Sequence, residues 1–322
     1  MSAEHAQTRV AIVGCGGIAK SHAAAIGELE DLELAAVVDT DPAALAAAEE
    51  AWHAPGYGSV GELLSGPTID VACICTPPAT HRALAEEFLG AGVDVLCEKP
   101  LATSVEDAEA MILAAERASR KLAVSDKFRH VADLVEAGRR VQAGEIGRPL
   151  HYAVSFCAPV DVRGRWPSDP ALSGGGVLMD NGPHAFDVLS HVLDAPIAEV
   201  KAVLGEPVLA PPVEDTAQLL FRTESGTTGS VELSWAYFTK DLDYLVVQGT
   251  EGALRVGWTG GQVRKHGERE WTSFGSGYDK KAAFRGVWGA CLTGAPEAEL
   301  SASGSTALRW IERATQSAQV GL

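Results

Sequence analysis

The amino-acid sequence predicts an α/β protein built from two domains. The first observation is the length of 322 residues, which suits two domains better than one. The second is that short apolar runs alternate with helical patterns up to residue 125, as is typical of a parallel sheet covered by helices. The third is a change of period after residue 126, where apolar and polar residues alternate and predict an open, mainly antiparallel sheet.

Five apolar runs in the first domain, residues 1–125, are predicted to be buried strands. They span residues 9–14, 32–39, 70–76, 93–98 and 121–126. Two of the helices between them carry capping signals. Asp41 followed by Pro42 is typical of an N-cap and a first helical position, and Ser104 with Asp107 resembles a capping box.

The second domain, residues 126–322, contains four runs that we expect to pair as two hairpins around glycine-containing turns. These runs span residues 217–222, 228–235, 243–249 and 253–258. Strands that pair through short turns predict a large antiparallel sheet with one exposed face. A final helix over about residues 302–319 has one apolar face and can pack back toward the N-terminal domain.

Composition excludes several classes of function. The formal net charge is −17, and such a field repels nucleic acid and anionic membrane surfaces. We see neither a secretory signal at the N-terminus nor an apolar run long enough to span a bilayer. The six cysteines form no CxxC pair, which favours buried, reduced thiols. Together these features predict a cytoplasmic protein that binds neither nucleic acid nor membrane.

The stretch GCGGIA, residues 14–19, follows the first predicted strand and opens the first helix. It matches the pattern G-x-G-x-x-G/A, in which glycines permit a tight turn and a close approach of the backbone to a pyrophosphate. Asp39 ends the second strand, where a carboxylate can bind the adenosine ribose hydroxyls. The first domain is therefore predicted to be a Rossmann dinucleotide-binding domain. The candidate cofactor contacts in the turn are Gly14, Gly16, Gly17 and Ile18.

Asp39 also bears on which dinucleotide binds. Its carboxylate repels a 2′-phosphate, and the residues after it, Thr40, Asp41 and Pro42, include no arginine that could accommodate one. The sequence therefore favours NAD over NADP.

Further candidates lie where predicted strands end, since ligands of open α/β folds bind at the carboxyl edge of the sheet. Thr76 ends the third long strand, and His81, on the next helix, could face either the cofactor or solvent. Glu98 and Lys99 end the following strand. A lysine there can hydrogen-bond a substrate hydroxyl and stabilise a developing alkoxide.

Asp180 and His184 lie four residues apart, which is helical spacing. The pair could bind a metal, form a satisfied structural contact or transfer a proton. The sequence has no HExxH or Cys/His cluster to complete a metal site, so we predict none. Pro183 lies between the two residues, so the helix either continues with a bend or restarts there with Asn181 as its cap.

Four motifs in order along the chain, GCGGIA, CTPPATH, CEKP and GGGVLMDNGPHAFD, resemble those of the glucose–fructose oxidoreductase / inositol dehydrogenase / rhizopine catabolism (Gfo/Idh/MocA) family. The resemblance spans nearly the whole chain. It implies an N-terminal Rossmann domain and a C-terminal α/β domain with an open antiparallel sheet that forms homodimers or homotetramers. It also implies hydride transfer between a nicotinamide and a ring carbon of a sugar, amino-sugar or cyclitol.

The same resemblance implies roles for individual residues. The family's catalytic lysine matches Lys99, and its D-x-x-x-H pair matches Asp180 and His184. Glu98 matches an acid near the nicotinamide. The remaining implied contacts are Arg165 and Trp166 with the nucleotide, and Arg129, Asn181 and Tyr237 with the substrate. The segment SDKFRHV, residues 125–131, departs from the aromatic–arginine–aromatic string of relatives, which puts the substrate contacts of this segment in question.

The expected mechanism uses His184 as the general base, because its unperturbed pKa lies near neutrality. Lys99 hydrogen-bonds the same substrate oxygen, and Asp180 orients Lys99. The reverse assignment, with Lys99 as the base, stays open. Two other functions remain as alternatives: a non-catalytic dinucleotide-sensing regulator, and an enzyme that keeps its cofactor bound and shuttles hydride between two sugars.

Overall fold

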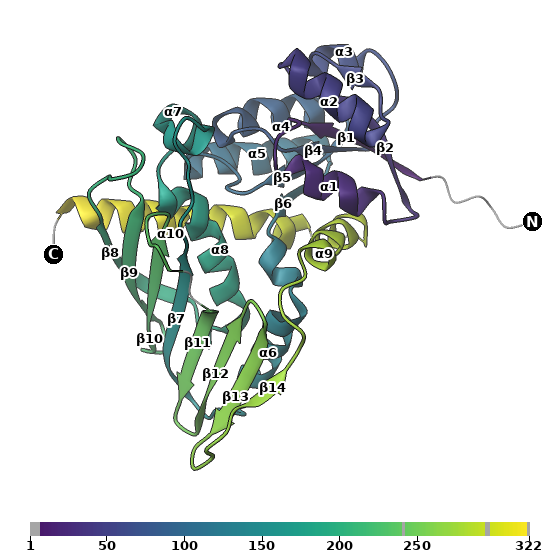
Figure 1. The fold of residues 1–322 in the computed structure, drawn as a ribbon. Helices are drawn as coiled ribbons and strands as arrows, with labels where there is room; N and C mark the ends of the chain where they lie inside the picture. Colours follow the sequence, from purple (N-terminus) through teal and green to yellow (C-terminus); the bar gives the residue numbers. More distant parts are fainter. Residues whose placement is uncertain (1–6, 240–241, 294–296, 321–322) are drawn as a thin grey trace, which may run out of the picture. The chain divides into compact units, whose positions relative to one another are not determined.

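The computed structural model describes residues 7–239, 242–293 and 297–320 (Figure 1). The chain divides into two compact units. The first combines residues 1–125 with 281–305, and the second combines residues 126–280 with 306–322. Each unit has its own sheet, as the sequence predicts, so the α/β fold class is confirmed.

The sheet of the first unit is parallel, with strand order β3-β2-β1-β4-β5-β6. Its strands are β1 (Thr8–Val13), β2 (Leu32–Val38), β3 (Gly56–Tyr57), β4 (Val71–Ile74), β5 (Asp94–Glu98) and β6 (Leu122–Ser125). All five predicted strands are present. The sequence analysis missed β3, because two residues are too short to show a period.

Helices connect these strands. They are α1 (Ala19–Ile26), α2 (Pro42–Trp52), α3 (Val60–Leu64), the 3₁₀ turn η1 (Pro78–Thr80), α4 (His81–Gly90) and α5 (Val105–Ala118). Both predicted caps are confirmed: the Asp41 carboxylate accepts from the Ala43 N–H at 2.9 Å, and Ser104 Oγ accepts from the Asp107 N–H at 3.1 Å. Each cap satisfies a backbone donor that the helix itself leaves without a partner.

Helix α9 (Lys280–Thr293) belongs almost entirely to the first unit, whereas the sequence analysis assigned residues 281–305 to the second domain. The reason lies in its apolar face. Phe284 and Trp288 are buried in the core of the first unit, and both rings meet the His22 ring edge-on, at centroid distances of 4.8 and 5.9 Å. Burial of such large aromatic side chains outweighs chain order in deciding which unit a helix joins.

The second unit contains an eight-stranded sheet of order β14-β13-β12-β11-β7-β10-β9-β8. The strands are β7 (Pro149–Cys157), β8 (Ile197–Leu204), β9 (Thr216–Thr223), β10 (Thr228–Ser234), β11 (Asp243–Gly249), β12 (Gly252–Gly257), β13 (Gly260–Lys265) and β14 (Thr272–Phe274). The β7–β10 pair is parallel and the other pairs are antiparallel. The two hairpins predicted from the sequence are β9–β10 and β11–β12.

Helices α6 and α8 pack against this sheet. The helices of the unit are η2 (Lys127–His130), α6 (Ala132–Gln142), η3 (Trp166–Ser168), α7 (Pro170–Ser173), α8 (Val177–Val192) and most of α10 (Glu297–Val320). Strands β8 and β9 keep apolar side chains in solvent, with Val203 48% and Leu220 65% exposed. The sheet therefore has one covered face and one open face.

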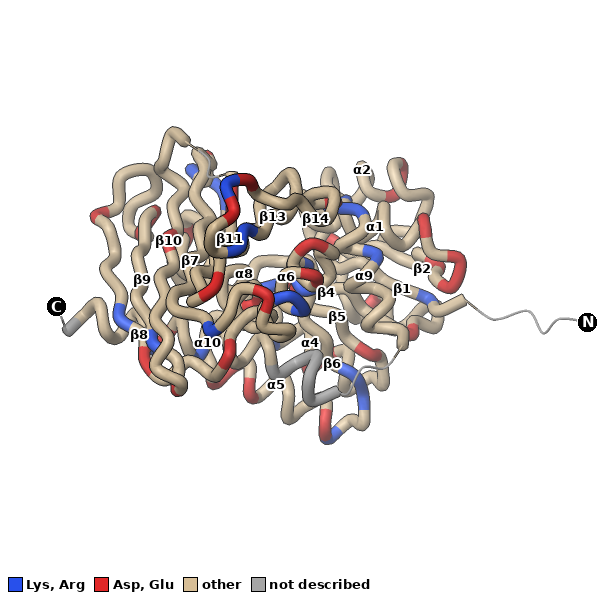
Figure 2. Tube along the Cα trace, turned by 90° about the horizontal axis from the view of Figure 1, so that it is seen from below, with Lys and Arg blue, Asp and Glu red and all other residues tan. Residues whose placement is uncertain are grey.

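Two observations bear on partners. Within the described residues, no helix combines the length and the apolar character that a membrane crossing requires. Figure 2 shows basic residues interspersed with acidic ones in both units.

Candidate functional site

The glycine-rich turn of the first unit has the geometry that its motif predicts. Gly14 has a φ of +89°, and its N–H donates to the Val38 carbonyl at 2.8 Å. A Cβ at this position would lie 2.8 Å from Thr76 Cγ2 and 3.0 Å from the backbone next to it. The left-handed backbone and the close approach of the segment after β4 both require glycine.

The next two glycines leave the backbone open. Gly16 and Gly17 are exposed, and a Cβ on either would meet no atom within 4 Å. Helix α1 then begins at Ala19, which is fully buried, while Ile18 is half-buried. An open backbone before a helix N-terminus suits the approach of a pyrophosphate, so these residues fit the predicted dinucleotide.

Asp39 is held by backbone donors. Its two carboxylate oxygens accept from the Cys15 N–H at 2.7 Å and from the Asp41 N–H at 2.9 Å. Each oxygen keeps a lone pair, so the group can also accept from ribose hydroxyls.

Glu98, at the end of β5, is 6% exposed and has a partner that sequence reasoning missed. Its Oε1 lies 2.9 Å from Nε2 of the fully buried His22, and its Oε2 accepts from the Lys99 N–H at 3.1 Å. A signal for His22 existed, since it lies three residues after Ala19 and four before Ile26, on the buried face of α1. These bonds fix Glu98 and the backbone of Lys99.

His81 is fully buried, so the solvent-facing alternative is wrong. Its Nε2 lies 2.9 Å from the Thr76 carbonyl, and its Nδ1 lies 3.1 and 3.2 Å from the carbonyls of Pro100 and Leu101. Burial lowers the pKa of His81, and the contacts with the three carbonyls oppose that shift. His81 thus joins the loops after β4 and β5.

In the second unit, α8 runs without interruption from Val177 to Val192 with Pro183 inside it. The alternative of a helix that restarts at Pro183 is therefore wrong, and Asp180 and His184 lie one turn apart on one helix. Asn181 does not cap a helix. Its Nδ2 donates to the Phe156 carbonyl at 3.3 Å and ties α8 to β7.

The N-terminus of α8 is held by Glu214. Its carboxylate accepts from the N–H groups of Gly176 and Leu178, each at 3.1 Å, and its carbonyl accepts from the Val177 N–H at 2.9 Å. A Cβ on Gly176 would overlap that carbonyl oxygen. Glycine is therefore needed at position 176, so that the backbone of Glu214 can approach the start of α8 closely.

His184 is 7% exposed and lies among aromatic rings. The ring centroids of Phe128 and Phe156 are 5.0 and 6.1 Å from its own. Its Nε2 lies 3.2 Å from Nζ of Lys127, a residue that the sequence analysis did not single out. The one sequence signal that could have pointed to Lys127 was the departure of residues 125–131 from the pattern of relatives.

Comparisons with known proteins decide the family. Residues 8–126 match the family model described as "Oxidoreductase family, NAD-binding Rossmann fold", and residues 134–255 match the model "GFO/IDH/MocA C-terminal domain". Together the two matches cover more than half of the chain. The chain belongs to the Gfo/Idh/MocA family. The sequence-based predictions of this family, of an oxidoreductase and of an NAD-binding domain are confirmed.

Individual members of the family are similar over most of the chain. D-apiose dehydrogenase of Paraburkholderia graminis is 32% identical over 76% of this chain and 66% of its own length, just under two thirds. scyllo-Inositol 2-dehydrogenase (NAD(+)) of Bacillus subtilis is 28% identical over 79% of this chain and 75% of its own. The crystal structure of the WlbA dehydrogenase from Bordetella pertussis, in complex with NADH and UDP-GlcNAcA, has a TM-score of 0.83, 28% identity and 98% coverage of both chains.

In this Gfo/Idh/MocA protein, Arg129 has a partner on α8. Its Nη2 and Nε donate to Asp187 Oδ1 at 2.7 and 3.1 Å, and its N–H donates to Oδ2 at 3.0 Å. Asp126 Oδ2 lies 3.7 Å from the same guanidinium. The guanidinium of Arg129 thus binds a buried carboxylate. Its contact with the substrate stays a prediction.

The other predicted contacts in the second unit have local partners. Arg165 is exposed and donates to the Asp161 carbonyl at 3.2 Å, and Trp166 is half-buried where η3 begins. The Tyr237 hydroxyl donates to Glu232 at 3.0 Å, which raises the pKa of Tyr237. None of these bonds involves Asp180 or His184.

One group of possible metal ligands occurs among the described residues. The ligand atoms of His22, Cys73 and Cys75 lie within 4.8 Å of one another. Burial raises the pKa of Cys73 well above its usual value, which favours the protonated thiol. Asp180 and His184 do not belong to this group.

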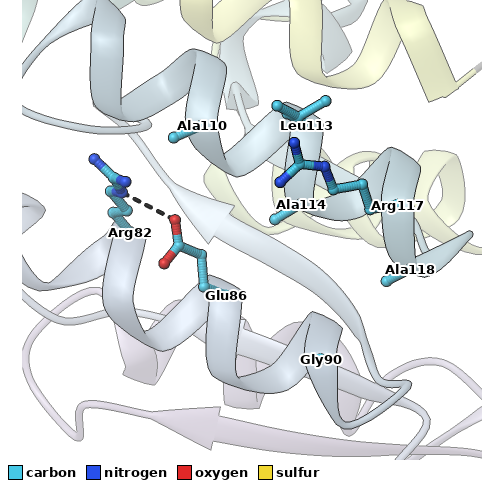
Figure 3. A pocket seen from close by; sticks show the side chains of 8 residues that line it. All are labelled: Arg82, Glu86, Gly90, Ala110, Leu113, Ala114, Arg117 and Ala118. Atoms are coloured by element: carbon cyan, nitrogen blue, oxygen red, sulfur yellow. Dashed lines mark hydrogen bonds and ion pairs between the residues drawn. The ribbon is translucent and has the colours of Figure 1, made fainter.

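A surface pocket lies between α4 and α5. Figure 3 shows Arg82 and Glu86 of α4 pointing toward each other; Arg82 Nε lies 2.9 Å from Glu86 Oε1. Residues of α5 from Ala110 to Ala118 complete the lining. None of the predicted cofactor or catalytic residues is part of it.

Proposed function

We propose that this Gfo/Idh/MocA protein is an NAD-dependent dehydrogenase that oxidises a ring carbinol of a sugar, amino-sugar or cyclitol, or reduces the corresponding ketone. Family membership supports an oxidoreductase that binds NAD. The names of its relatives support the substrate class, because they include a sugar dehydrogenase and an inositol dehydrogenase.

The observation that carries the proposal is His184. It is the nearly buried imidazole of α8, one turn after Asp180, and its Nε2 is within hydrogen-bond distance of an ammonium. An imidazole in a water-poor aromatic environment is suited to exchange one proton with a hydroxyl near neutral pH.

The first unit would hold the cofactor. Gly14 and Gly16 let the backbone approach the pyrophosphate, Asp39 binds the adenosine ribose, and Thr76 lies at the carboxyl edge of the sheet. NAD, when bound, supplies the hydride acceptor. The carboxylate of Asp39 favours NAD over NADP, since it would repel a 2′-phosphate.

His184 then takes the proton of the substrate hydroxyl. Lys99 hydrogen-bonds the same oxygen and stabilises its negative charge, and Asp180 orients Lys99. In the alternative assignment, Lys99 is the base and His184 orients it. The pH–rate profile distinguishes the two assignments, because its acid limb is lost when the base itself is replaced.

We further propose that the protein is a homodimer or homotetramer that pairs through the open face of the second sheet. The exposed apolar residues Val203 and Leu220 on that face support this. Light scattering coupled to gel filtration tests it, and a monomer at micromolar concentration would contradict it.

The enzymatic proposal is tested by turnover. The protein is mixed with NAD and a panel of sugars, inositols and amino-sugars, and with NADH and keto-sugars, and absorbance is followed at the NADH band. Turnover of at least one compound, lost in His184→Ala, is the expected result. Binding of NADH without turnover of any compound would overturn the proposal and leave the dinucleotide-sensing regulator.

A further inference from the structure

Lys127 brings a positive charge to His184. It begins η2, two residues after β6, whereas His184 lies on α8, 57 residues further along the chain. The 3.2 Å between Lys127 Nζ and His184 Nε2 is a hydrogen-bond distance. The ammonium also lies 5.4 Å from the centre of the Phe128 ring, against which His184 packs.

The direction of this bond defines the state of the imidazole. A lysine ammonium can only donate, so His184 Nε2 must accept. An imidazole that accepts at Nε2 is neutral, with its proton on Nδ1. A positive charge at this distance also opposes a second proton on the ring, which lowers its pKa.

Other charged and titratable groups lie on and around α8. The carboxylate of Asp180, one turn earlier on the helix, favours the protonated ring and so opposes Lys127. Arg129 and Asp187 largely cancel each other, since they form a buried pair. Burial, together with Arg129, lowers the pKa of His130 and of His191 to about 4. Burial also raises the pKa of Tyr244, which stacks on Phe156. These last three groups are therefore neutral near pH 7.

We propose that Lys127 is a positioning residue that keeps His184 neutral and its Nε2 ready to accept the substrate proton. The inference rests on the proposed function, in which His184 is the base. The substrate hydroxyl replaces the ammonium at Nε2, and its proton moves from oxygen to Nε2. The nearby Lys127 charge disfavours the imidazolium so formed, which promotes transfer of its proton to water once the product has left.

The first test needs no turnover. The pKa of His184 is measured by NMR of histidine-labelled protein, with the signal assigned through His184→Gln. Lys127→Met should raise that pKa by about one unit, because a neighbouring positive charge is lost. Lys127→Arg, which keeps the charge, should leave it nearly unchanged. Lys201→Met, which removes an exposed lysine from β8 of the same unit, is the matched control and should also leave it unchanged.

The second test uses the pH dependence of kcat/KM. The acid limb reports protonation of the base, so in Lys127→Met it should move to higher pH by the same unit, while the plateau at higher pH changes less. Thermal melts establish that each variant is folded, and Lys127→Gln replaces Lys127→Met if the latter is not.

The outcomes separate the two proposals. An unchanged His184 pKa in folded Lys127→Met overturns the role of Lys127, whatever the wild-type protein turns over. If Lys127→Met raises the pKa of His184 but the wild-type protein oxidises no compound, the effect of Lys127 on His184 is supported and the proposed dehydrogenase activity is overturned. A raised pKa with a shifted acid limb supports both.

Discussion

Asp39 in the first unit and the side chains around His184 in the second unit are held in different ways. In the first unit, Asp39 accepts from the backbone of Cys15 and Asp41, which lie in the glycine turn and directly after the strand. In the second unit, Lys127 meets His184 and Arg129 meets Asp187, with about 60 residues of chain between the partners. The first arrangement follows from a strand–turn–helix motif, and the second requires a whole helix to dock on a sheet.

This difference indicates which site is more sensitive to replacement of single side chains. Backbone donors persist whatever the side chains are, so the cofactor half depends on few positions. The second half depends on pairs of side chains, and each pair fails when either member is removed. The following predictions test that contrast, from the largest expected effect to the smallest.

The largest effect is expected for His184→Ala. Loss of a general base lowers kcat by about 10²–10⁴-fold. The dissociation constant of NADH should stay unchanged, because Gly14 and Asp39 lie in the other unit. Steady-state kinetics and a fluorescence titration with NADH measure the two. His266→Ala, at an exposed position of the same unit, is the control, and full turnover in His184→Ala would contradict the assignment.

The next effect concerns the buried pair of Arg129 and Asp187, whose side chains are 19% and 2% exposed. Asp187→Ala leaves the guanidinium without its partner and should lower the free energy of unfolding by about 3–5 kcal/mol. Asp161→Ala removes a carboxylate from an exposed pair with Arg163 and should cost much less, because solvent screens both charges. Chemical denaturation measures both. Equal losses would show that burial does not distinguish the pairs.

A smaller effect is expected in the first unit for His22→Ala. The variant removes the partner of Glu98 Oε1 and should cost about 1–3 kcal/mol, because a buried carboxylate oxygen loses its hydrogen bond. A double-mutant cycle with Glu98→Gln measures the coupling. Additive losses would mean that the 2.9 Å contact carries no energy.

The smallest effect is expected for Asp39→Asn. The amide keeps the shape of the side chain but loses its charge and one of the two acceptors for the Cys15 and Asp41 N–H groups. The dissociation constant of NADH should therefore rise about tenfold and that of NADPH should rise less or fall. Titration at one salt concentration measures both, with Asp31→Asn as an exposed control. A wild-type protein that binds NADPH more tightly than NADH would refute the role given to Asp39.

Much of the fold could be predicted because its signals are local. The five long strands of the first sheet and the caps at Asp41 and Ser104 depend on residues within a few positions of each other. The same holds for Gly14, whose backbone conformation follows from the turn itself. The short strand β3 carried too few residues to show a pattern.

The sequence by itself determined the family, the dinucleotide motif and the helical spacing of Asp180 and His184. Only the tertiary structure decided that α8 continues through Pro183, that Glu214 holds its first turn, and that Lys127 lies against His184. It also decided that α9 joins the first unit and that His22 binds Glu98. The physical reason is range: turns and caps form between neighbours in the chain, whereas buried polar partners are chosen by packing between segments that no local pattern connects.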